Sequence, residues 1–397
     1  MAPCPSRSTG MVAAVTSDAS SRPSRWTVVR EWGRLGCIGF GGPPTHIALL
    51  RQLCVERRGW MSAREFEDAI AACNLLPGPA STQLAIFCAW RVRGRTGAVL
   101  GGVAFIVPGL IVILVLAALF LTGAPPRWAR GAGAGAGAAV AAVAVQAGVN
   151  LLPASWRRAR EVNPWRFAGY LVATGAAAAL LGPWLVLVLL GCGLVELLAQ
   201  RIPPRGGRAA AALPLAAGGG VLLSVAWVAL KVGALSYGGG FVIIPLMQSD
   251  AVHRYHWMSA GQFLNAVVFG QITPGPVVQT VAVVGYAAAG LGGGLLAAVC
   301  AFTPSFLFIL IGAAHFDRLR TDRRVRAFLD GAGPAAIGAI LGSAVPLARG
   351  LSAPWQYAVL AGAAVLLLVL RRGVVLTLLC AAAAGALVVL AGGPLPA

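Results

Sequence analysis

The chain alternates long apolar runs with short polar segments that are rich in arginine. Uninterrupted apolar runs predict membrane spans at about 97–122, 132–152, 164–181 and 183–199, and again at about 292–316, 331–349, 355–370 and 374–392. One further span is predicted at about 212–231. Because a helix of about 20 residues crosses the roughly 30 Å hydrocarbon core of a bilayer, the pattern predicts an all-α polytopic membrane protein.

The composition agrees with this class and removes several others. Of the 397 residues, 58% are hydrophobic and 11% are charged, whereas about a quarter of the residues of a soluble domain are charged. A soluble enzyme and a secreted disulfide scaffold are therefore excluded, and the unbroken apolar runs argue against a β-barrel. The eight cysteines are scattered without a CxxC or Cys/His spacing, so neither a metal site nor a cofactor is expected.

An internal repeat becomes visible when the sequence is shifted by 197 residues against itself. Trp60–Ala63 (WMSA) then aligns with Trp257–Ala260, and Pro77–Pro79 (PGP) aligns with Pro274–Pro276. Chance matches in a low-complexity sequence would align alanine and glycine, but not two such motifs in one register. The chain is therefore interpreted as a tandem duplication.

Each repeat is predicted to begin with two apolar segments that glycine or proline interrupts. These segments lie at about 26–52 and 66–90 in a first repeat, 26–208, and at about 223–248 and 262–290 in a second repeat, 209–397. Inside a bilayer, a broken helix is tolerated where protein or a water-filled cavity surrounds the freed backbone groups. Corresponding breaks in two halves predict a substrate site near the bilayer midplane, between the repeats.

The formal net charge of +19 comes mainly from arginine clusters between the spans, so no nucleic-acid partner is expected. Counting alternate spans, the clusters at 91–95, 157–166 and 201–208 lie on one side of the first half, whereas those at 318–326 and 371–372 lie on the opposite side of the second half. If all clusters are cytoplasmic, the repeats are inverted relative to each other. The expected arrangement has residues 1–25 as a disordered tail in the cytoplasm and the C-terminus on the opposite side of the membrane.

Candidate substrate-binding residues lie at the breaks and at one pair of cations. Arg34 and Lys231, the only lysine, occupy the same repeat position, and a cation in an apolar segment suggests function, with snorkelling to the interface as the alternative. The glycine-rich elements permit close approach of the backbone to an ion or, alternatively, close helix packing. The predicted binding residues are Arg34, Gly41, Gly42, Asn74, Pro77, Gly78, Pro79, Lys231, Gly238, Gly239, Gln271, Pro274, Gly275 and Pro276.

Carboxylates are scarce near the broken segments, which favours an anion over a cation as substrate. Glu56 and Asp250 are candidates for carrying protons, with pairing to Arg51, Arg57 or Arg254 as the alternative role. His46 is a weaker candidate for the same function. Two positive groups and two restarted helices, each with its positive dipole end at the break, would suit a small dianion.

These motifs together resemble the chromate ion transporter family in its long-chain, two-domain form. The resemblance rests on Arg34–Pro43 (RLGCIGFGGP), His46, Val55–Trp60 and Leu75–Gln83 in the first half, and on Leu230–Ala234, Gly238–Gly240 and Gln271–Pro276 in the second. Members of the family usually carry lysine where this chain has Arg34, and glutamine where it has Asn74. Both replacements keep the polar character of the position.

The resemblance implies export of chromate by a proton antiporter, chromate resistance, and sulfate as a structural analogue of the substrate. Uptake of sulfate or another oxyanion is the first alternative. A passive anion channel and a membrane-embedded enzyme are alternatives of other classes, although no acid–base or metal constellation supports an enzyme. The alternation of glycine and alanine at 131–137 would serve either internal helix packing or the interface of a homodimer.

Overall fold

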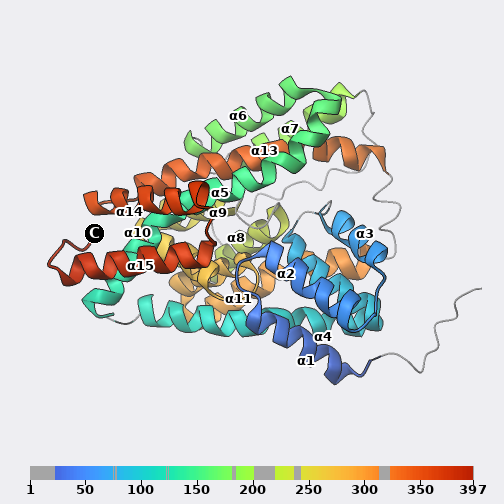
Figure 1. Cartoon of the computed structure of the whole chain (residues 1–397), viewed down its shortest axis with the longest axis horizontal. Helices are drawn as coiled ribbons and strands as arrows, with labels where there is room; N and C mark the ends of the chain where they lie inside the picture. Colours follow the sequence, from blue (N-terminus) through green and yellow to red (C-terminus); the bar gives the residue numbers. More distant parts are fainter. Residues whose placement is uncertain are drawn as a thin grey trace, which may run out of the picture.

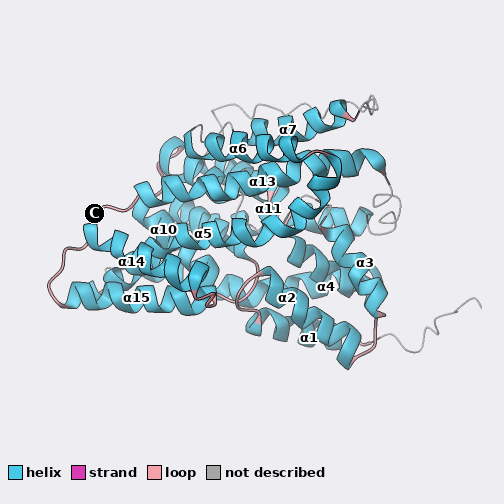
Figure 2. Ribbon diagram, turned by 45° about the horizontal axis from the view of Figure 1, so that its top comes forward, coloured by secondary structure: helices cyan, strands magenta, loops and turns pink. Residues whose placement is uncertain are grey.

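A computed structural model of the chain describes residues 23–74, 76, 78–121, 123, 125–180, 185–200, 220–236, 243–312 and 322–396. All regular structure in these residues is helical, and four helices are long and apolar enough to cross a membrane, which confirms the predicted class (Figure 2). Residues 1–22 of the predicted tail, the 208/209 repeat boundary, Pro77, Gly238 and Gly239 lie outside the described residues.

The helices follow the duplication. The first repeat holds α1 (Arg25–Ile38), α2 (Pro43–Arg51), the π-helix η2 (Gln52–Arg57), α3 (Ala63–Cys73), α4 (Ala80–Leu121), α5 (Arg127–Val162), α6 (Pro164–Leu180) and α7 (Leu185–Ala199). The second holds α8 (Val221–Leu235), α9 (Ile243–Gln248), the π-helix η4 (Ser249–Arg254), α10 (Ala260–Ile272), the 3₁₀ turn η5 (Val277–Gln279), α11 (Thr280–Gly312), α13 (Arg323–Arg349), α14 (Pro354–Ala364), the π-helix η7 (Val365–Val369) and α15 (Val374–Leu390).

The repeated WMSA motif marks the start of a helix in each repeat. The Ser62 side chain accepts a hydrogen bond from the backbone N–H of Glu65, and the Glu65 carboxylate accepts one from the N–H of Ser62. Ser259 and Gln262 form the same reciprocal pair before α10. Such capping boxes satisfy backbone donors that a helix start otherwise leaves free, so the motif places α3 and α10 at equivalent points.

Helices α4 and α11 each fold back on themselves. The backbone leaves helical geometry at Gly94 (φ 64°) and Gly290 (φ 61°), conformations that glycine adopts readily. The two arms of each hairpin then touch, since a Cβ atom on Gly97 would lie 2.3 Å from the carbonyl oxygen of Ala89. The turns fall where the sequence predicts the broken segments to end, at about 90 and 290.

The later helices are exchanged between the repeats. Helix α5 packs against α14 and α15 of the second repeat, and its equivalent α13 packs against α6 and α7 of the first (Figure 1). A Cβ atom on Gly135 would lie 2.2 Å from the carbonyl oxygen of Ala381, so small residues allow this contact. Gly133 and Gly137 face α10 instead. The glycine–alanine stretch therefore serves internal packing, and a homodimer stays a prediction.

The two repeats run in opposite directions. Glu65 and Gln262 are equivalent positions in the two repeats. Glu65 pairs with Arg91, which lies near the start of the second arm of the α4 hairpin. Gln262 instead lines a cavity together with Leu121, at the far end of that arm. The arm spans residues 95–121 and is about 40 Å long. In Figure 1, α3 and α10 accordingly lie toward opposite ends of the longest axis. This arrangement agrees with the predicted inverted repeats.

Candidate substrate site between the repeats

The two Pro-Gly-Pro loops meet the glycine-rich break of the other repeat. The backbone N–H of Gly78 donates to the carbonyl oxygen of Ser236 at 2.7 Å, and the N–H of Gly275 donates to the carbonyl oxygen of Gly39 at 3.0 Å. Gly78 is equivalent to Gly275, and Gly39 is equivalent to Ser236. The contact is therefore reciprocal, as expected for two copies related by an approximate two-fold axis.

Each loop also contacts the long helix of the other repeat. A Cβ atom on Gly78 (φ 124°) would lie 3.2 Å from Ser305 Oγ on α11, and one on Gly109 of α4 would lie 2.0 Å from the carbonyl oxygen of Pro274. Ser305 and Gly109 each follow a proline within a membrane-spanning helix. Both loops are thus enclosed by parts of both repeats, as the inverted-repeat interpretation predicts for a substrate site.

Buried hydrogen-bonding groups collect around the two loops. Five side-chain atoms here have no partner within the described part of the chain: Thr82 Oγ1, Ser236 Oγ, Ser305 Oγ, Gln271 Nε2 and Gln279 Oε1. A buried polar group without a partner costs about 1–3 kcal/mol, so a cluster of them requires an explanation. Three hydroxyls and an amide nitrogen are hydrogen-bond donors, and a polar ligand that accepts hydrogen bonds would satisfy them.

Lys231 forms an ion pair with Asp250, whose side chain is 1% exposed. Lys231 lies on α8, just over one turn before the Ser236 carbonyl that binds the first loop, and Asp250 lies in the π-helix η4. The ammonium contacts Oδ2, while Oδ1 is buried and has no partner within the described residues. The alternative prediction, in which Asp250 pairs with Arg254, is wrong: Asp250 pairs with Lys231, and the Arg254 guanidinium lies over the Tyr255 ring.

His46 connects the glycine-rich break to the start of α4. Its Nε2 lies 2.9 Å from the carbonyl oxygen of Gly39, and its Nδ1 lies 3.2 Å from Ser81 Oγ. Because a carbonyl only accepts hydrogen bonds, Nε2 carries the proton and the neutral Nδ1 accepts from the hydroxyl. The same Gly39 carbonyl binds Gly275, so His46 helps to hold the second loop in place.

The structure places other predicted residues less centrally. Arg34 is exposed and makes no ion pair within the described residues. Glu56 pairs with Arg51 at 3.7 Å on an exposed surface, which is the alternative role considered for it. Asn74 is exposed, although the equivalent Gln271 is buried.

The remaining predicted glycines and prolines lie at the loops. Gly41 and Gly42 have positive φ angles before α2, and Gly42 lies beside Val277, which directly follows the second loop. Pro79 and Pro276 are buried at the ends of the two loops. These positions agree with a role in shaping the loops.

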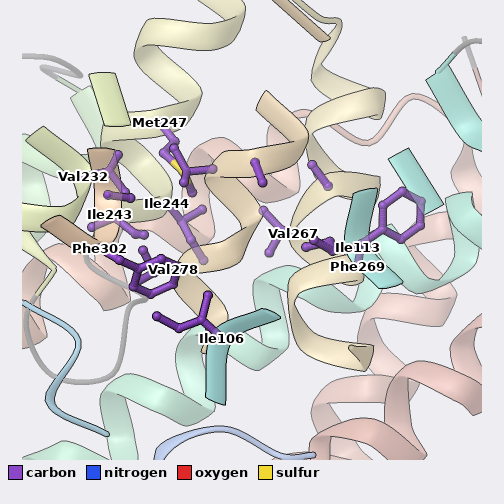
Figure 3. Packing of buried hydrophobic residues seen from close by; sticks show 14 of the residues in the cluster. Ile106, Ile113, Val232, Ile243, Ile244, Met247, Val267, Phe269, Val278 and Phe302 are labelled. Carbon is purple, nitrogen blue, oxygen red and sulfur yellow. The ribbon is translucent and has the colours of Figure 1, made fainter. Parts of the chain in front are cut away.

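Apolar side chains surround the polar cluster. Figure 3 shows Ile106 of α4 close to Val278 and Phe302 of the second repeat, with Ile243, Ile244 and Met247 of α9 nearby. A polar site in such surroundings has a low effective dielectric, which strengthens its interactions with a charged ligand.

Ser305, one of the fully buried unpartnered hydroxyls, was not among the residues predicted from the sequence. The only signal was a serine after Pro304 within an apolar span, at the position where the first repeat has Gly109. A single serine in a membrane helix usually bonds to its own backbone, so its place beside Gly78 required the tertiary structure.

Comparison with known sequences agrees with this architecture. The profile of the family described as chromate transporter matches residues 26–197 and 223–386, one match in each repeat. The chain belongs to the chromate transporter family. The family assignment and the helical fold together describe a membrane-embedded, multi-pass transporter.

Individual relatives cover most of the chain. A chromate transport protein of Cupriavidus metallidurans is 33% identical over 329 residues, which are 80% of this chain and 80% of that protein. A chromate transport protein of Pseudomonas aeruginosa is 28% identical over 344 residues, covering 80% and 79%. The uncharacterized transporter MJ0718 of Methanocaldococcus jannaschii is 25% identical over 332 residues, covering 76% and 78%. No solved structure matches the chain.

Proposed function

We propose that this protein exports chromate from the bacterial cytoplasm across the inner membrane, energised by the proton motive force, and thereby confers chromate resistance. The observation that carries the proposal is the pair of reciprocal Pro-Gly-Pro loops with unpartnered donors around them. The alternating-access mechanism expected of inverted repeats would expose these loops to each side of the membrane in turn.

The donor set suits a tetrahedral dianion. Thr82, Ser236 and Ser305 offer hydroxyl groups, Gln271 offers an amide N–H, and Lys231 supplies positive charge near the first loop. Hydrogen bonds to a charged acceptor contribute about 1.5–3 kcal/mol each, which supports binding of a desolvated oxyanion. Sulfate has the same shape and charge, so inward transport of sulfate is the competing function that the experiment must separate.

The Lys231–Asp250 pair links the anion to a proton. An oxyanion that approaches Lys231 weakens the attraction of the ammonium for Asp250, and a carboxylate that loses its cation binds a proton more readily. By reciprocity, protonation of Asp250 strengthens anion binding. A dianion carried with one proton keeps a net charge of −1, and an inside-negative membrane potential drives that charge outward with about 2.3 kcal/mol per 100 mV.

Antiport, in which protons and the anion occupy the site in turn, makes a different prediction. For the linked binding described above, valinomycin with potassium abolishes export because it removes the membrane potential, whereas nigericin, which removes the pH gradient, does not reduce export. For antiport, nigericin inhibits export. Measuring chromate export with each ionophore separates the two mechanisms.

The orientation is part of the proposal. We place the N-terminus in the cytoplasm and the C-terminus in the periplasm, with the loop at Gly290 also periplasmic. Alkaline phosphatase fused after residue 290 should then be active in intact cells. A cytoplasmic reporter that is active at this point would overturn the orientation.

The main test is radiolabelled chromate accumulation in cells that express the chain. Export predicts lower accumulation than in control cells, a return to the control level with a protonophore, and the same return in Lys231→Ala. Arg34→Ala at the equivalent exposed position is the matched control and should retain export. Unchanged or higher accumulation would contradict chromate export, and competition by sulfate would then identify uptake. Flux that never concentrates the anion would indicate a channel.

A further inference from the structure

A polar cavity lies away from the Pro-Gly-Pro loops. It has a volume of about 520 Å³ and opens where the C-terminal end of α4 meets the N-terminal ends of α5, α10 and α14. Leu395 and Pro396 from the end of the chain form part of its wall. The cavity is therefore bounded by both repeats, at the end of the molecule opposite the Glu65–Arg91 pair.

The cavity carries positive charge. Arg130 is the only charged residue that lines it, no aspartate or glutamate does, and Arg130 makes no ion pair within the described residues. Arg130 also lies in the first turn of α5. A cation there interacts unfavourably with the positive end of the helix dipole, because cations stabilise a helix at its C-terminal end. The N-termini of α10 and α14 contribute the positive ends of their helix dipoles to the cavity, whereas only α4 contributes a negative C-terminal end. The helix dipoles therefore add to its positive potential. An arginine placed against its own helix dipole would be stabilised by a bound anion.

One amide in the cavity is available to a ligand. Gln262 caps α10 through its Oε1. Gln356 accepts hydrogen bonds from the two backbone N–H groups just before α14 and donates to the carbonyl oxygen of Ala134. Asn265 makes no hydrogen bond within the described part of the chain and lies against Gly133, since a Cβ atom there would be 2.9 Å from Asn265 Oδ1. The equivalent residues of the first repeat are the acids Glu65 and Asp68, so only the second repeat offers neutral amides at this position.

An aromatic pair connects the cavity with the second Pro-Gly-Pro loop. Phe120 lines the cavity, and its ring meets the ring of Phe269 edge to face at 4.9 Å between centroids. Phe269 is 4% exposed, and its carbonyl oxygen accepts hydrogen bonds from both the N–H and the hydroxyl of Thr273, the residue before the loop. Figure 3 shows Ile113 of α4 beside Phe269. These apolar side chains separate the cavity from the loop.

We infer that this cavity is a periplasmic exit vestibule for the transported oxyanion, in which Arg130 and Asn265 bind the anion after it has passed the Phe120–Phe269 barrier. This inference rests on the proposed function for the identity of the anion and for the direction of its transport. Focusing of positive potential in such a cavity stabilises an anion that has left the inner site, and in the reverse direction it raises the local concentration of anions from the periplasm.

The test is the reactivity of a cysteine introduced by Asn265→Cys. The background for this variant is a parent chain in which serine replaces Cys4, Cys37 and Cys380. The parent chain, measured alone, gives the reactivity of the cysteines that remain. Reaction rates are measured with an anionic and a cationic methanethiosulfonate, and each is divided by its rate with a free small thiol. We expect the anionic reagent to be favoured, and Arg130→Gln to reduce that preference roughly fivefold. An unreactive thiol in the Asn265→Cys chain would overturn the vestibule. So would a preference for the anionic reagent that stays the same when Arg130 is replaced.

Added oxyanions separate this inference from the proposed function. Protection of the introduced cysteine by chromate supports both. Protection by sulfate alone supports the vestibule and contradicts chromate as the substrate, while absence of protection by either overturns the vestibule.

Transport supplies a second readout. Asn265→Asp introduces the carboxylate that the first repeat has at this position. In anion exchange measured with right-side-out vesicles, it should raise the KM for the anion on the periplasmic side roughly tenfold with little change in kcat. The reciprocal change Asp68→Asn in the first repeat is the control for altered charge at an equivalent helix. A similar KM for Asn265→Asp and the wild type would contradict a role for this residue in binding the anion.

Discussion

The two repeats share their backbone breaks but differ in the charges placed around them. The second repeat has a buried Lys231–Asp250 pair, whereas the first has an exposed Arg34 and, at the position of Asp250, the buried Leu53. The first repeat has His46 where the second has Ile243. Duplication therefore supplied a symmetrical frame of loops, and later divergence placed an ion pair of the Lys231–Asp250 kind beside the break of the second half only. The comparison predicts that equivalent substitutions in the two repeats have unequal effects.

The largest difference is expected between Lys231 and Arg34. Removing one partner of a buried charge pair costs about 2–5 kcal/mol, so Lys231→Ala should reduce chromate export at least about 30-fold, while Arg34→Ala should change it less than about threefold. Initial rates in everted vesicles measure both. Because Lys231→Ala leaves Asp250 unpaired, the double variant Lys231→Ala/Asp250→Asn should restore folding, seen by size-exclusion chromatography, but not export. Equal losses at Arg34 and Lys231 would show that both repeats contribute a cation.

The loop glycines should also differ. A methyl group on Gly78 would lie 2.4 Å from Gln83 Nε2, whereas the nearest atoms to one on Gly275 are 3.4 Å away. Both have positive φ, so either alanine strains the backbone by about 1–3 kcal/mol, and Gly78→Ala adds a collision. We expect Gly78→Ala to lower the Tm in detergent and the export rate more than Gly275→Ala does. The reverse order would mean that the second loop is the tighter of the two.

The carboxylates Asp250 and Glu56 offer a comparison in pH dependence. When one group carries the proton, the export rate of the wild type changes by at most about tenfold per pH unit. If that group is Asp250, the variant Asp250→Asn should lose this dependence on pH. Glu56→Gln, which removes an exposed pair with Arg51, should keep the wild-type pH profile. Export rates between pH 5.5 and 8.5, at a constant membrane potential, measure this. A flat profile in Glu56→Gln would assign the proton to the first repeat.

Buried hydroxyls with and without partners form the next comparison. Ser305 has no partner within the described residues, whereas Ser343 donates to the carbonyl oxygen of Ile340 at 2.6 Å. Ser305→Ala should raise the KM for chromate about fivefold, the effect of about 1 kcal/mol, and leave the Tm unchanged. Ser343→Ala should lower the Tm by a few degrees and leave KM unchanged. A fall in Tm without a change in KM for Ser305→Ala would remove this hydroxyl from the site.

The smallest effect is expected at the capping boxes. The backbone N–H of Ser62 and the Arg91 guanidinium hold the pKa of Glu65 below its usual value. A lowered folded-state pKa stabilises the fold above the unfolded-state pKa, and this contribution disappears as the pH falls through the folded-state pKa. Glu65→Gln, which copies Gln262, should therefore destabilise the protein by less than about 1 kcal/mol at pH 7 and by less still near pH 4. Thermal unfolding at the two pH values is the measurement.

The membrane class, the duplication and the breaks at Pro77–Pro79 and Pro274–Pro276 could be predicted because each depends on local chemistry. Apolar runs of span length, proline without an amide hydrogen and a capping serine act within a few residues of their own position. The predicted ends of the broken segments also coincide with the turns at Gly94 and Gly290.

Contacts between distant segments were decided by the tertiary structure. Asp250 has Arg254 nearby in sequence but pairs with Lys231, because the π-helix η4 packs its carboxylate toward α8. Ser305 gains its place only because α11 crosses the loop of the other repeat, and the exchange of α5 and α13 between repeats has no signal beyond small residues. Local patterns determine where helices begin, break and end, whereas the choice of partners follows from packing, which no single segment of sequence encodes.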